Sequence, residues 1–424
     1  MPIELLRGMR DYGPGEAIRL REITSKVEDV FRRFGFYPIE TPSLESTETL
    51  NAKAYGREAE KEMYTLDDGK SGLIYDLTVP LARYVSMNKG LSLPFKRYQI
   101  AKAWRRDEPQ RMRSRELIQA DIDIVGSAEP TSEAEAIAAT AIALEGVGVT
   151  DYTILISSRV ILNAIMEIFK VPEDKRTGVM ITIDKLGKIS REKALEQISE
   201  SGVGEKQAEA LLNFINEEME NAKKLQKIKN DAPSVTAESD RLSSIISLLG
   251  NYGINGAVKV DFSLARGLGY YTGTVWELVA EKDGKRLPTI AAGGRYDGLI
   301  GIYSKTPMPA VGSSIGLSRV YEVVDIGEAI NTYATVYVAN IGQENVEYAL
   351  KAANTMRSNG IRVDMNLTAR NISKQLEYAN AMRIKYVAIV GGREKEQNMI
   401  RLRDMGDGSE ELLSIEDVLK KLKG

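Results

Sequence analysis

Apolar and polar side chains alternate along two neighbouring stretches of this chain. In residues 98–104 and 117–125 apolar side chains tend to recur at every second position. This period-2 pattern predicts two β-strands. The segment between them contains Asp107-Glu108-Pro109-Gln110, which favours a turn because proline cannot donate to a strand ladder. We therefore expect an antiparallel hairpin with a long loop. The arginines in or beside that loop are Arg105, Arg106, Arg111, Arg113 and Arg115.

The second strand of this hairpin carries polar residues on one face. Gln119, Asp121 and Asp123 are spaced by two, so their side chains lie on the same side of the strand. That face offers carboxylates for a cation or an amine, and the loop offers arginines for phosphate. A solvated, charged hairpin explains the same pattern, so the pattern alone leaves both interpretations open.

Helical spacing dominates three other segments. Apolar residues at Ile23, Val27, Val30 and Phe31 predict an amphipathic helix over 18–34, and Gly35 is suited to its end. Residues 131–144 are alanine-rich and also predict a helix. Residues 171–249 are rich in Glu, Lys, Asn and Ser with helical stripes, and they lie between predicted strands at 152–157 and 257–262. We interpret them as a helical insertion into a sheet.

The C-terminal segment alternates between strand-like and helical patterns. Strands are predicted at 335–340, 362–366 and 386–391, with helices at 345–358 and 371–382 between them. This alternation implies parallel strands joined by helical crossovers, hence a small α/β domain. Residues 399–403 and 411–413 flank an Asp-Gly turn that predicts a hairpin, and Ser414 with Asp417 predicts the start of a closing helix.

Composition narrows the chemistry that the chain can perform. Its 424 residues favour several domains, and 43% hydrophobic with 28% charged residues is typical of a globular protein. There are 0 His and 0 Cys, which excludes an imidazole base, a thiolate nucleophile and a Cys/His zinc site. No apolar run is long enough for a membrane span, no signal peptide is evident, and we expect a cytoplasmic protein. The net charge of −3 argues against indiscriminate coating of nucleic acid.

Two glycine-containing motifs suggest a ligand site. Arg266-Gly267-Leu268-Gly269-Tyr270-Tyr271 places a permanent cation beside two phenols where glycine permits close approach. Gly293-Gly294-Arg295-Tyr296-Asp297 also has paired glycines. Further on, Gly316-Leu317-Ser318-Arg319 predicts a strand that enters a helix. A structural strand with a surface arginine is the alternative interpretation of the first motif.

Taken together, these segments resemble the histidyl-tRNA synthetases among the class II aminoacyl-tRNA synthetases. The hairpin from Arg105 to Asp123 is similar to class II motif 2, and residues 312–320 are similar to motif 3. The helix ending at Gly35, with Phe36-Tyr37-Pro38-Ile39-Glu40-Thr41-Pro42, is similar to motif 1. The two glycine-containing motifs resemble the signatures of the histidine enzymes. The matches occur in the family's order and span nearly the whole chain.

The resemblance implies an architecture and an activity. The fold would be an α+β catalytic domain on an antiparallel sheet (1–170 and 250–327), a helical insertion (171–249) and a C-terminal α/β anticodon-binding domain (329–424). The activity would be aminoacyl-tRNA ligation: L-histidine is activated with ATP and Mg²⁺, then transferred to tRNA(His). The protein would be a homodimer through the motif 1 region, with no membrane partner and no metal held by the protein itself.

The resemblance also assigns roles to individual residues. Arg266 and Arg105 would be catalytic, contacting the α-phosphate and the substrate carboxylate. ATP would further contact Asp107, Arg113 and Arg319. The histidine pocket would be formed by Asp76, Thr78, Gln119, Asp123, Arg266, Tyr270 and Tyr271, with Asp123 and Tyr271 on the two ring nitrogens.

Some positions depart from the family pattern. Leu117 stands where an aromatic residue usually stacks on adenine, Ile74-Tyr75 replaces a frequent Arg-Pro, and Gly269 replaces a common aspartate. The alternative function is a catalytically inactive paralogue that senses histidine as a regulatory subunit of histidine biosynthesis. Such paralogues typically lack the anticodon-binding domain and the arginine/tyrosine signature. Another class II specificity would require a different pocket at 266–271.

Overall fold

The computed structural model describes residues 3–51, 63–110, 112–186, 189–254, 258–265, 269–282, 285–304, 306–324 and 331–423. The chain divides into two compact units, one formed by residues 1–10 and 23–325 and the other by residues 11–22 and 326–424. Among the described residues, no helix is both long enough and apolar enough to span a bilayer.

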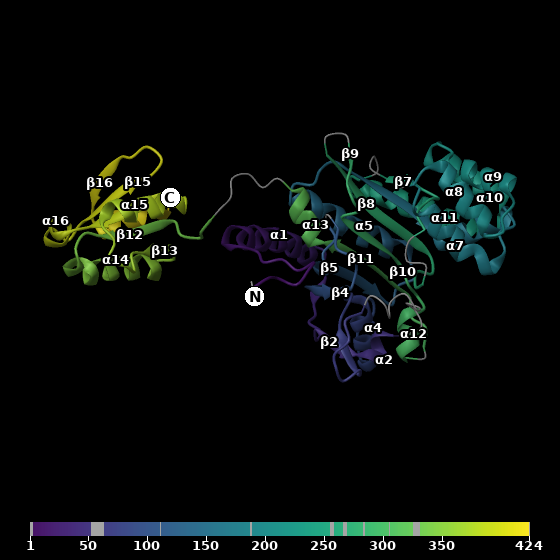
Figure 1. The fold of residues 1–424 in the computed structure, drawn as a ribbon, viewed down its shortest axis with the longest axis horizontal. Coiled ribbons are helices and arrows are strands. Elements are labelled where there is room, and N and C mark those ends of the chain that lie inside the picture. The colour runs from purple at the N-terminus through teal and green to yellow at the C-terminus, as the bar shows by residue number, and fades with distance from the viewer. Residues whose placement is uncertain are drawn as a thin grey trace. The chain divides into compact units, whose positions relative to one another are not determined.

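A large mixed sheet organises the first unit (Figure 1). Its strands run in the order β1 (Tyr37–Pro38), β4 (Phe95–Trp104), β5 (Glu116–Val125), β11 (Ala310–Gly316), β10 (Ala291–Arg295), β8 (Thr274–Lys282), β6 (Tyr152–Ser158) and β7 (Val258–Val260), with β9 (Lys285–Arg286) pairing with β8. All pairs from β4 to β6 are antiparallel, while β1–β4 and β6–β7 are parallel. The predicted antiparallel sheet is therefore confirmed at its centre, and the edges make it mixed.

Helix α5 (Pro130–Gly146) packs against strands β5, β10 and β11 of this sheet. Its alanines are buried, with Ala138, Ala139 and Ala141 each 0% exposed, and their small side chains let the helix lie close to the strands. Helix α1 (Pro14–Arg33) ends before Gly35, whose φ of +74° is the left-handed conformation that glycine adopts most easily. Helix α13 (Leu317–Val323) follows β11 directly, as the sequence predicts.

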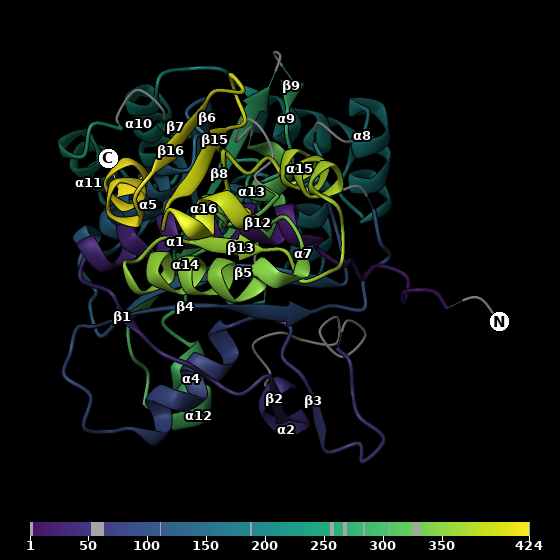
Figure 2. The ribbon, with the colours of Figure 1, turned by 90° about the vertical axis from the view of Figure 1, so that its left-hand side faces the viewer.

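A smaller group of elements lies beside the β4–β5 hairpin. The strands β2 (Leu44–Ser46) and β3 (Ser71–Leu73) pair, and α2 (Thr47–Leu50) packs on them and on α4 (Thr78–Met87). Helix α12 (Leu299–Ser304) packs on α4, and the three helices group together in Figure 2. None of these short elements is predicted by the period of the sequence.

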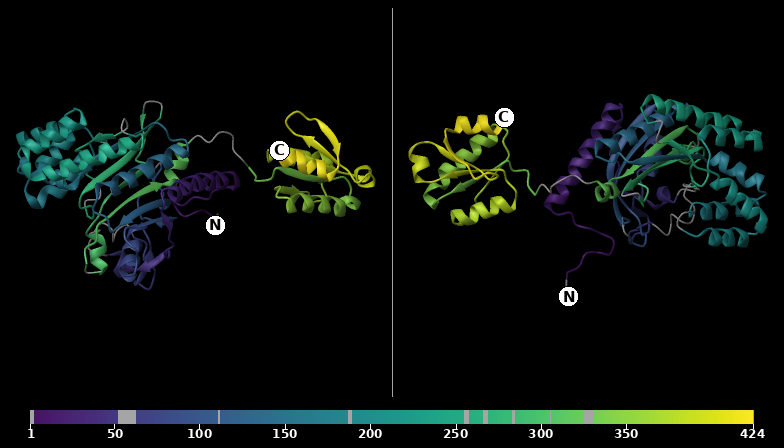
Figure 3. Two further views of the ribbon diagram at one scale, coloured as in Figure 1. Left: turned by 180° about the vertical axis from the view of Figure 1, so that it is seen from behind. Right: turned by 90° about the horizontal axis from the view of Figure 1, so that it is seen from above.

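Between the parallel neighbours β6 and β7 the chain is helical. The helices are α6 (Arg159–Ile168), α7 (Glu173–Ile183), α8 (Arg191–Glu200), α9 (Glu205–Asn216), α10 (Asn221–Asp231) and α11 (Thr236–Asn251), with a 3₁₀ turn at Pro233–Val235. Figure 3 shows α7 to α11 gathered at one end of the large sheet. Apolar stripes such as Ala208, Leu211 and Leu212 are buried at 0% exposure, so the helical pattern over 171–249 is confirmed.

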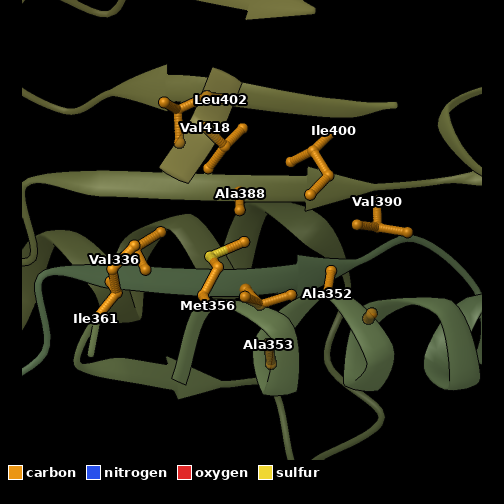
Figure 4. Close-up of a cluster of buried hydrophobic side chains, with 12 residues drawn as sticks. Val336, Ala352, Ala353, Met356, Ile361, Ala388, Val390, Ile400, Leu402 and Val418 are labelled. Atoms are coloured by element: carbon orange, nitrogen blue, oxygen red, sulfur yellow. The ribbon is translucent and has the colours of Figure 1, made fainter. Parts of the chain in front are cut away.

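The C-terminal residues form a separate five-stranded sheet in the order β13 (Val363–Met365), β12 (Val336–Asn340), β14 (Tyr386–Val390), β15 (Ile400–Asp404), β16 (Glu410–Leu413). The predicted parallel strands and the closing hairpin are confirmed. Helices α14 (Val346–Ser358) and α17 (Ile415–Lys423) pack on one face around Met356 and Val418 (Figure 4). Helix α15 (Ile372–Ala381) packs on the other face around Tyr337 and Ile389. The short elements that complete this unit are a 3₁₀ turn at Gln343–Asn345 and α16 (Gly392–Glu396).

Candidate active site

A pocket opens on the large sheet where β5 and β11 lie side by side. It has a volume of about 210 Å³ including its open mouth. The residues that line it come from α4, β5, the segment before β8, β10 and β11: Thr78, Asp121, Asp123, Tyr270, Tyr271, Ala292, Tyr296, Gly312, Ser313 and Ser314.

Strand register places two aspartates on the floor of this pocket. In the β5–β11 pairing Asp123 faces Gly312 and Asp121 faces Ser314. A Cβ at position 312 would lie 1.9 Å from Oδ1 of Asp123, so only glycine leaves room for that carboxylate. The shared face that the sequence predicts for these aspartates is therefore the face of the site.

Asp123 is held by two groups that come from other strands. Arg97, opposite it on β4, approaches with a guanidinium nitrogen 2.6 Å from Oδ2, and this arginine is 0% exposed. The contact is an ion pair whose angle falls short of a hydrogen bond, and Arg97 also donates to the carbonyl of Leu77 at 3.1 Å. The hydroxyl of Tyr296 donates to Oδ1. Burial raises the pKa of Asp123, and Arg97 and Tyr296 oppose that rise.

Asp121 is buried with less compensation for its charge than Asp123 has. It is 3% exposed, and its Oδ1 has no hydrogen-bond partner among the described residues. Burial raises its pKa to about 7, the charge of Asp123 adds to the rise, and Arg97 and the Ser314 hydroxyl oppose it. Among the described residues, the pocket thus contains two carboxyls with one buried guanidinium, that of Arg97, beside them.

The aromatic wall of the pocket consists of three tyrosines. The rings of Tyr270 and Tyr271 stack with centroids 4.2 Å apart, and Tyr270 lies 5.6 Å from Tyr296. A Cβ on Gly294 would lie 2.6 Å from the Tyr271 ring, which explains a glycine at that position. Burial raises the pKa of both Tyr270 and Tyr271, so these phenols stay neutral near pH 7. Arg266, with Gly267 and Leu268, lies outside the described residues.

Of the remaining predicted histidine contacts, Asp76, Thr78 and Gln119, only Thr78 lines the pocket. Thr78 lines it as the first residue of α4, and Asp76 accepts a hydrogen bond from the Val79 amide at 3.0 Å. Asp76 acts electrostatically on Asp121, Asp123 and both stacked tyrosines, so it is near all of them. Gln119 donates to Ser314 Oγ at 2.6 Å, and its Oε1 is buried without a partner among the described residues.

The predicted phosphate-binding arginines that the structure describes, Arg105, Arg113 and Arg319, lie in or contact the loop between β4 and β5, and none of these three lines the pocket. Arg105 donates to the carbonyl of Tyr75 at 2.9 Å, and Arg113 donates to Asp107 at 2.8 Å. Arg319 donates to the carbonyls of Thr289 at 2.7 Å and of Met112 at 3.3 Å. Arg319, at the start of α13, thereby ties the loop to the end of the sheet. Arg111 lies outside the described residues.

Comparison with known proteins identifies the family. A family model for histidyl-tRNA synthetase matches residues 8–320, and a model for an anticodon binding domain matches residues 335–424. The chain belongs to the histidyl-tRNA synthetase family. A histidine–tRNA ligase of Korarchaeum cryptofilum is 36% identical over 416 residues, covering 94% of each chain. One of Bacillus cereus is 36% identical over 417 residues, covering 97% of each.

A solved structure supports the same assignment. The histidyl-tRNA synthetase of Nostoc superposes with a TM-score of 0.85 at 26% identity, over 100% of this chain and 99% of that one. The class II fold predicted from the sequence is therefore confirmed.

In this member of the histidyl-tRNA synthetase family, the residues of the Gly-Gly-Arg-Tyr-Asp motif have different structural roles. Arg295 makes two 2.8 Å hydrogen bonds to the fully buried carboxylate of Glu133 on α5, and Arg241 on α11 binds the same carboxylate at 2.7 Å. Asp297 accepts from the Ala310 amide of β11 at 3.0 Å. With its two neighbours anchored in this way, Tyr296 is fixed in place to reach Asp123.

Sequence reasoning did not include Arg97 or Tyr296 among the site residues. Arg97 lies on the first strand of the hairpin, whereas only the arginines in or beside its loop were considered from the sequence. The strand register is what places Arg97 opposite Asp123. Tyr296 lies within a motif that was recognised, directly after the paired glycines, and that neighbourhood is the signal that could have identified it.

Proposed function

We propose that this chain is a histidine–tRNA ligase, which forms histidyl-adenylate from L-histidine and ATP and then esterifies tRNA(His). The observation that carries the proposal is the pocket itself. In a chain of this family, a buried carboxylate that is held by an arginine and a tyrosine lines the same pocket as two stacked phenols. These groups are complementary to an imidazole with N–H donors.

Histidine would be selected because it pairs polar groups of the pocket that another amino acid would leave unpaired. Asp123 and Tyr271 would hydrogen-bond the two ring nitrogens, and Asp76, Thr78 and Gln119 would surround the amine and carboxylate. The partnerless Oε1 of Gln119 supports this orientation, since an α-ammonium would supply its missing donor. An amino acid without ring N–H groups would leave buried acceptors unpaired. Such sites reject analogues by roughly 10⁴–10⁵.

Activation needs no protein nucleophile. The histidine carboxylate attacks the α-phosphorus of ATP, a P–O bond forms, and the bond to the leaving pyrophosphate breaks. Arg266 and Arg105 would hold the carboxylate and the α-phosphate, two anions that otherwise repel. Arg113, with Asp107, and Arg319 would hold the rest of the nucleotide. The contacts of Arg319 to the loop and the sheet support a place at the nucleotide, because they bring this cation beside the motif 2 hairpin.

Magnesium would enter with the triphosphate. The hard oxygen ligands that Mg²⁺ prefers are plentiful on ATP, and the ion usually keeps several waters. Among the described residues no group of three or more acidic side chains is placed to hold a metal. Bound Mg²⁺ would offset phosphate charge, while the arginines would orient the reacting groups.

The remaining partners are assigned by segment. Residues 329–424 would bind the anticodon, residues 171–249 would approach the acceptor arm, and residues 1–170 with 250–327 would perform the chemistry. The motif 1 region would form a homodimer interface. Large apolar side chains are exposed in and beside that region, with Tyr37 at 68% and Leu44 at 48% exposure, which supports an interface there.

The alternative, a histidine-sensing regulatory subunit, is disfavoured. Such a protein would need only the pocket, whereas this chain retains a match to the anticodon binding domain over 335–424. It also retains the arginine and tyrosine residues of motif 2 and of the histidine signature.

The test is ATP–pyrophosphate exchange with the purified chain and each amino acid in turn, followed by charging of tRNA(His) transcripts. We expect exchange with histidine alone and charging of that tRNA. Histidine binding without exchange would overturn the proposal in favour of the regulatory function, and exchange with another amino acid would overturn the pocket assignment.

A further inference from the structure

One polar group in the pocket has no role in the site described above. Asp121 lines the pocket and is 3% exposed, yet its Oδ1 finds no hydrogen-bond donor among the described residues. Buried carboxylate oxygens are nearly always paired, so an unpaired one beside a ligand pocket points to a partner that arrives with the ligand.

The charges around Asp121 show which kind of partner fits. On its own strand, Asp123 takes the close contact of Arg97, at 2.6 Å. From β11 only the Ser314 hydroxyl bonds to Asp121. From β4 its register neighbour is Gln99, which is occupied with Thr41 at 3.0 Å. Asp76 and the phenol of Tyr271 add no positive charge. Among the described residues, two carboxyls therefore share one arginine, and no second cation lies beside them.

Spacing shows where such a cation would lie. Residues two apart on a strand are separated by roughly 6.6 Å. An imidazolium that is hydrogen-bonded at both nitrogens spans roughly 7 Å between its two acceptors. A ring above β5 that is held by Asp123 and Tyr271 can therefore lie against Asp121 as well, because all three side chains line the same pocket. Gln119, two residues before Asp121, is left for the amine.

We propose that Asp121 is a specificity-determining residue that contacts the histidine ring and makes the pocket bind it as an imidazolium. This inference rests on the proposed function, because it names the form of the substrate that the same site accepts. The raised pKa of Asp121, about 7, agrees with a carboxyl that lacks a permanent cation. Ring basicity would then be selected along with ring shape.

The test compares two ligands in two proteins. Histidine and triazolylalanine, a histidine isostere with a much less basic ring, are titrated calorimetrically into the parent chain and into Asp121→Asn. We expect the variant to lose about 10- to 100-fold in histidine affinity, the range for a hydrogen bond to a charged group. It should lose less than about threefold for triazolylalanine, which cannot supply the cation.

A second readout is proton uptake. At about pH 8 free histidine has a neutral ring, so binding it as imidazolium should take up about one proton in the parent and markedly less in Asp121→Asn. The uptake is measured from binding heats in buffers of different ionisation enthalpy. Equal affinity losses for both ligands, or proton uptake unchanged by the substitution, would overturn the inference.

Two controls separate this outcome from others. Asp364→Asn changes a carboxylate on β13 that accepts from Tyr378 at 3.1 Å, and it should leave both affinities unchanged. Asp121→Asn should melt no lower than the parent, because burial of that charge outweighs its contacts with Arg97 and Ser314. A drop of several degrees would make Asp121 structural. A parent that neither binds nor activates histidine would refute the proposed function itself. A parent that does both, with an unchanged ligand ratio in the variant, would refute only the role of Asp121.

Discussion

At the residue scale the pocket is built around charge that the protein itself does not fully neutralise. Asp121 and Asp123 are both buried, and the arginine that contacts Asp123 has further guanidinium nitrogens without partners among the described residues. Such an arrangement lowers the stability of the empty protein. That stability is recovered when a ligand of the right charge binds. The residues that we propose to select histidine should therefore also make the empty protein sensitive to pH.

Asp121→Asn tests that sensitivity. The folded-state pKa of Asp121, about 7, lies above its usual 3.8, so the folded protein holds this proton more tightly than the unfolded chain. The resulting stability is complete below about pH 4 and is lost as pH rises towards 7. Asp121→Asn should therefore be more stable than the parent by roughly 1–4 kcal/mol at about pH 8 and nearly equal to it at about pH 4. Urea unfolding at both pH values measures this, and a pH-independent difference would contradict it.

Arg266 is the residue on which the activation chemistry is expected to depend. Removal of a preorganised donor to developing charge typically costs roughly 10²–10³ in rate. We expect that loss for Arg266→Ala, and also impairment of Arg266→Lys, since an ammonium cannot make the same two-pronged bridge. ATP affinity should change much less, because Arg113 and Arg319 remain. Single-turnover adenylate formation decides the matter, and a near-parent rate in either variant would make Arg266 structural.

At the element scale the site depends on how closely β5 and β11 approach. Gly312→Ala would place a Cβ 1.9 Å from the Asp123 carboxylate and 2.9 Å from the Ile122 carbonyl. Because the strand backbone cannot yield, Asp123 should be pushed from Arg97 and Tyr296. We expect the KM for histidine to rise by about 100-fold or more, as for loss of a charged hydrogen bond with its buried partners left unpaired.

A matched control is Gly146→Ala at the end of α5, where nothing lies within 4 Å of the new Cβ. That substitution should leave KM unchanged and not lower the melting temperature. If Gly312→Ala retains the parent KM with a normal melting temperature, Asp123 does not contact the ring.

Elements with a clear hydrophobic period are the ones that sequence predicts. The β4–β5 hairpin, α1 and the C-terminal α/β alternation follow from periods of two or 3.6. Helix α5 follows instead from its alanine content, since it is buried nearly all round. The short β2–β3 pair, α2 and α12 have too few residues to show a period. A strand is the alternative interpretation of the motif that ends at Tyr271, but β8 starts only at Thr274, and Tyr270 lies in a turn before it.

The site residues likewise divide into those that local sequence predicts and those that it does not. Gln119, Asp121 and Asp123 come from one strand, so their common face is a local property that the sequence carries. Arg97 and Tyr296 reach Asp123 through strand pairing between segments far apart in the chain, and such pairing is set by packing of the whole sheet. The resemblance to a family supplied roles for residues, and the structure supplied the neighbours that give Asp123 its environment.

At the scale of the whole molecule, the two sheets belong to separate units with their own cores. The C-terminal sheet buries Val336, Ala388 and Met356 on one face and Tyr337 and Ile389 on the other, so both faces are covered from within residues 331–423. The unit that contains the large sheet also contains the pocket and every described site residue. This separation implies that amino-acid activation and tRNA recognition can be uncoupled by removal of a segment.

A chain that ends at residue 328 tests that separation. It retains the pocket and the motif 2 hairpin, so histidine-dependent pyrophosphate exchange should stay within about threefold of the parent, given that independent units have nearly additive effects. Charging of tRNA(His) should fall by roughly tenfold or more, because the anticodon-side contacts are lost and binding to phosphates is cumulative. The melting temperature and the oligomeric state of the shortened chain establish that it is folded. Loss of exchange in that folded protein would show that the C-terminal unit is needed for activation, and the assignment of chemistry to the large sheet alone would fail.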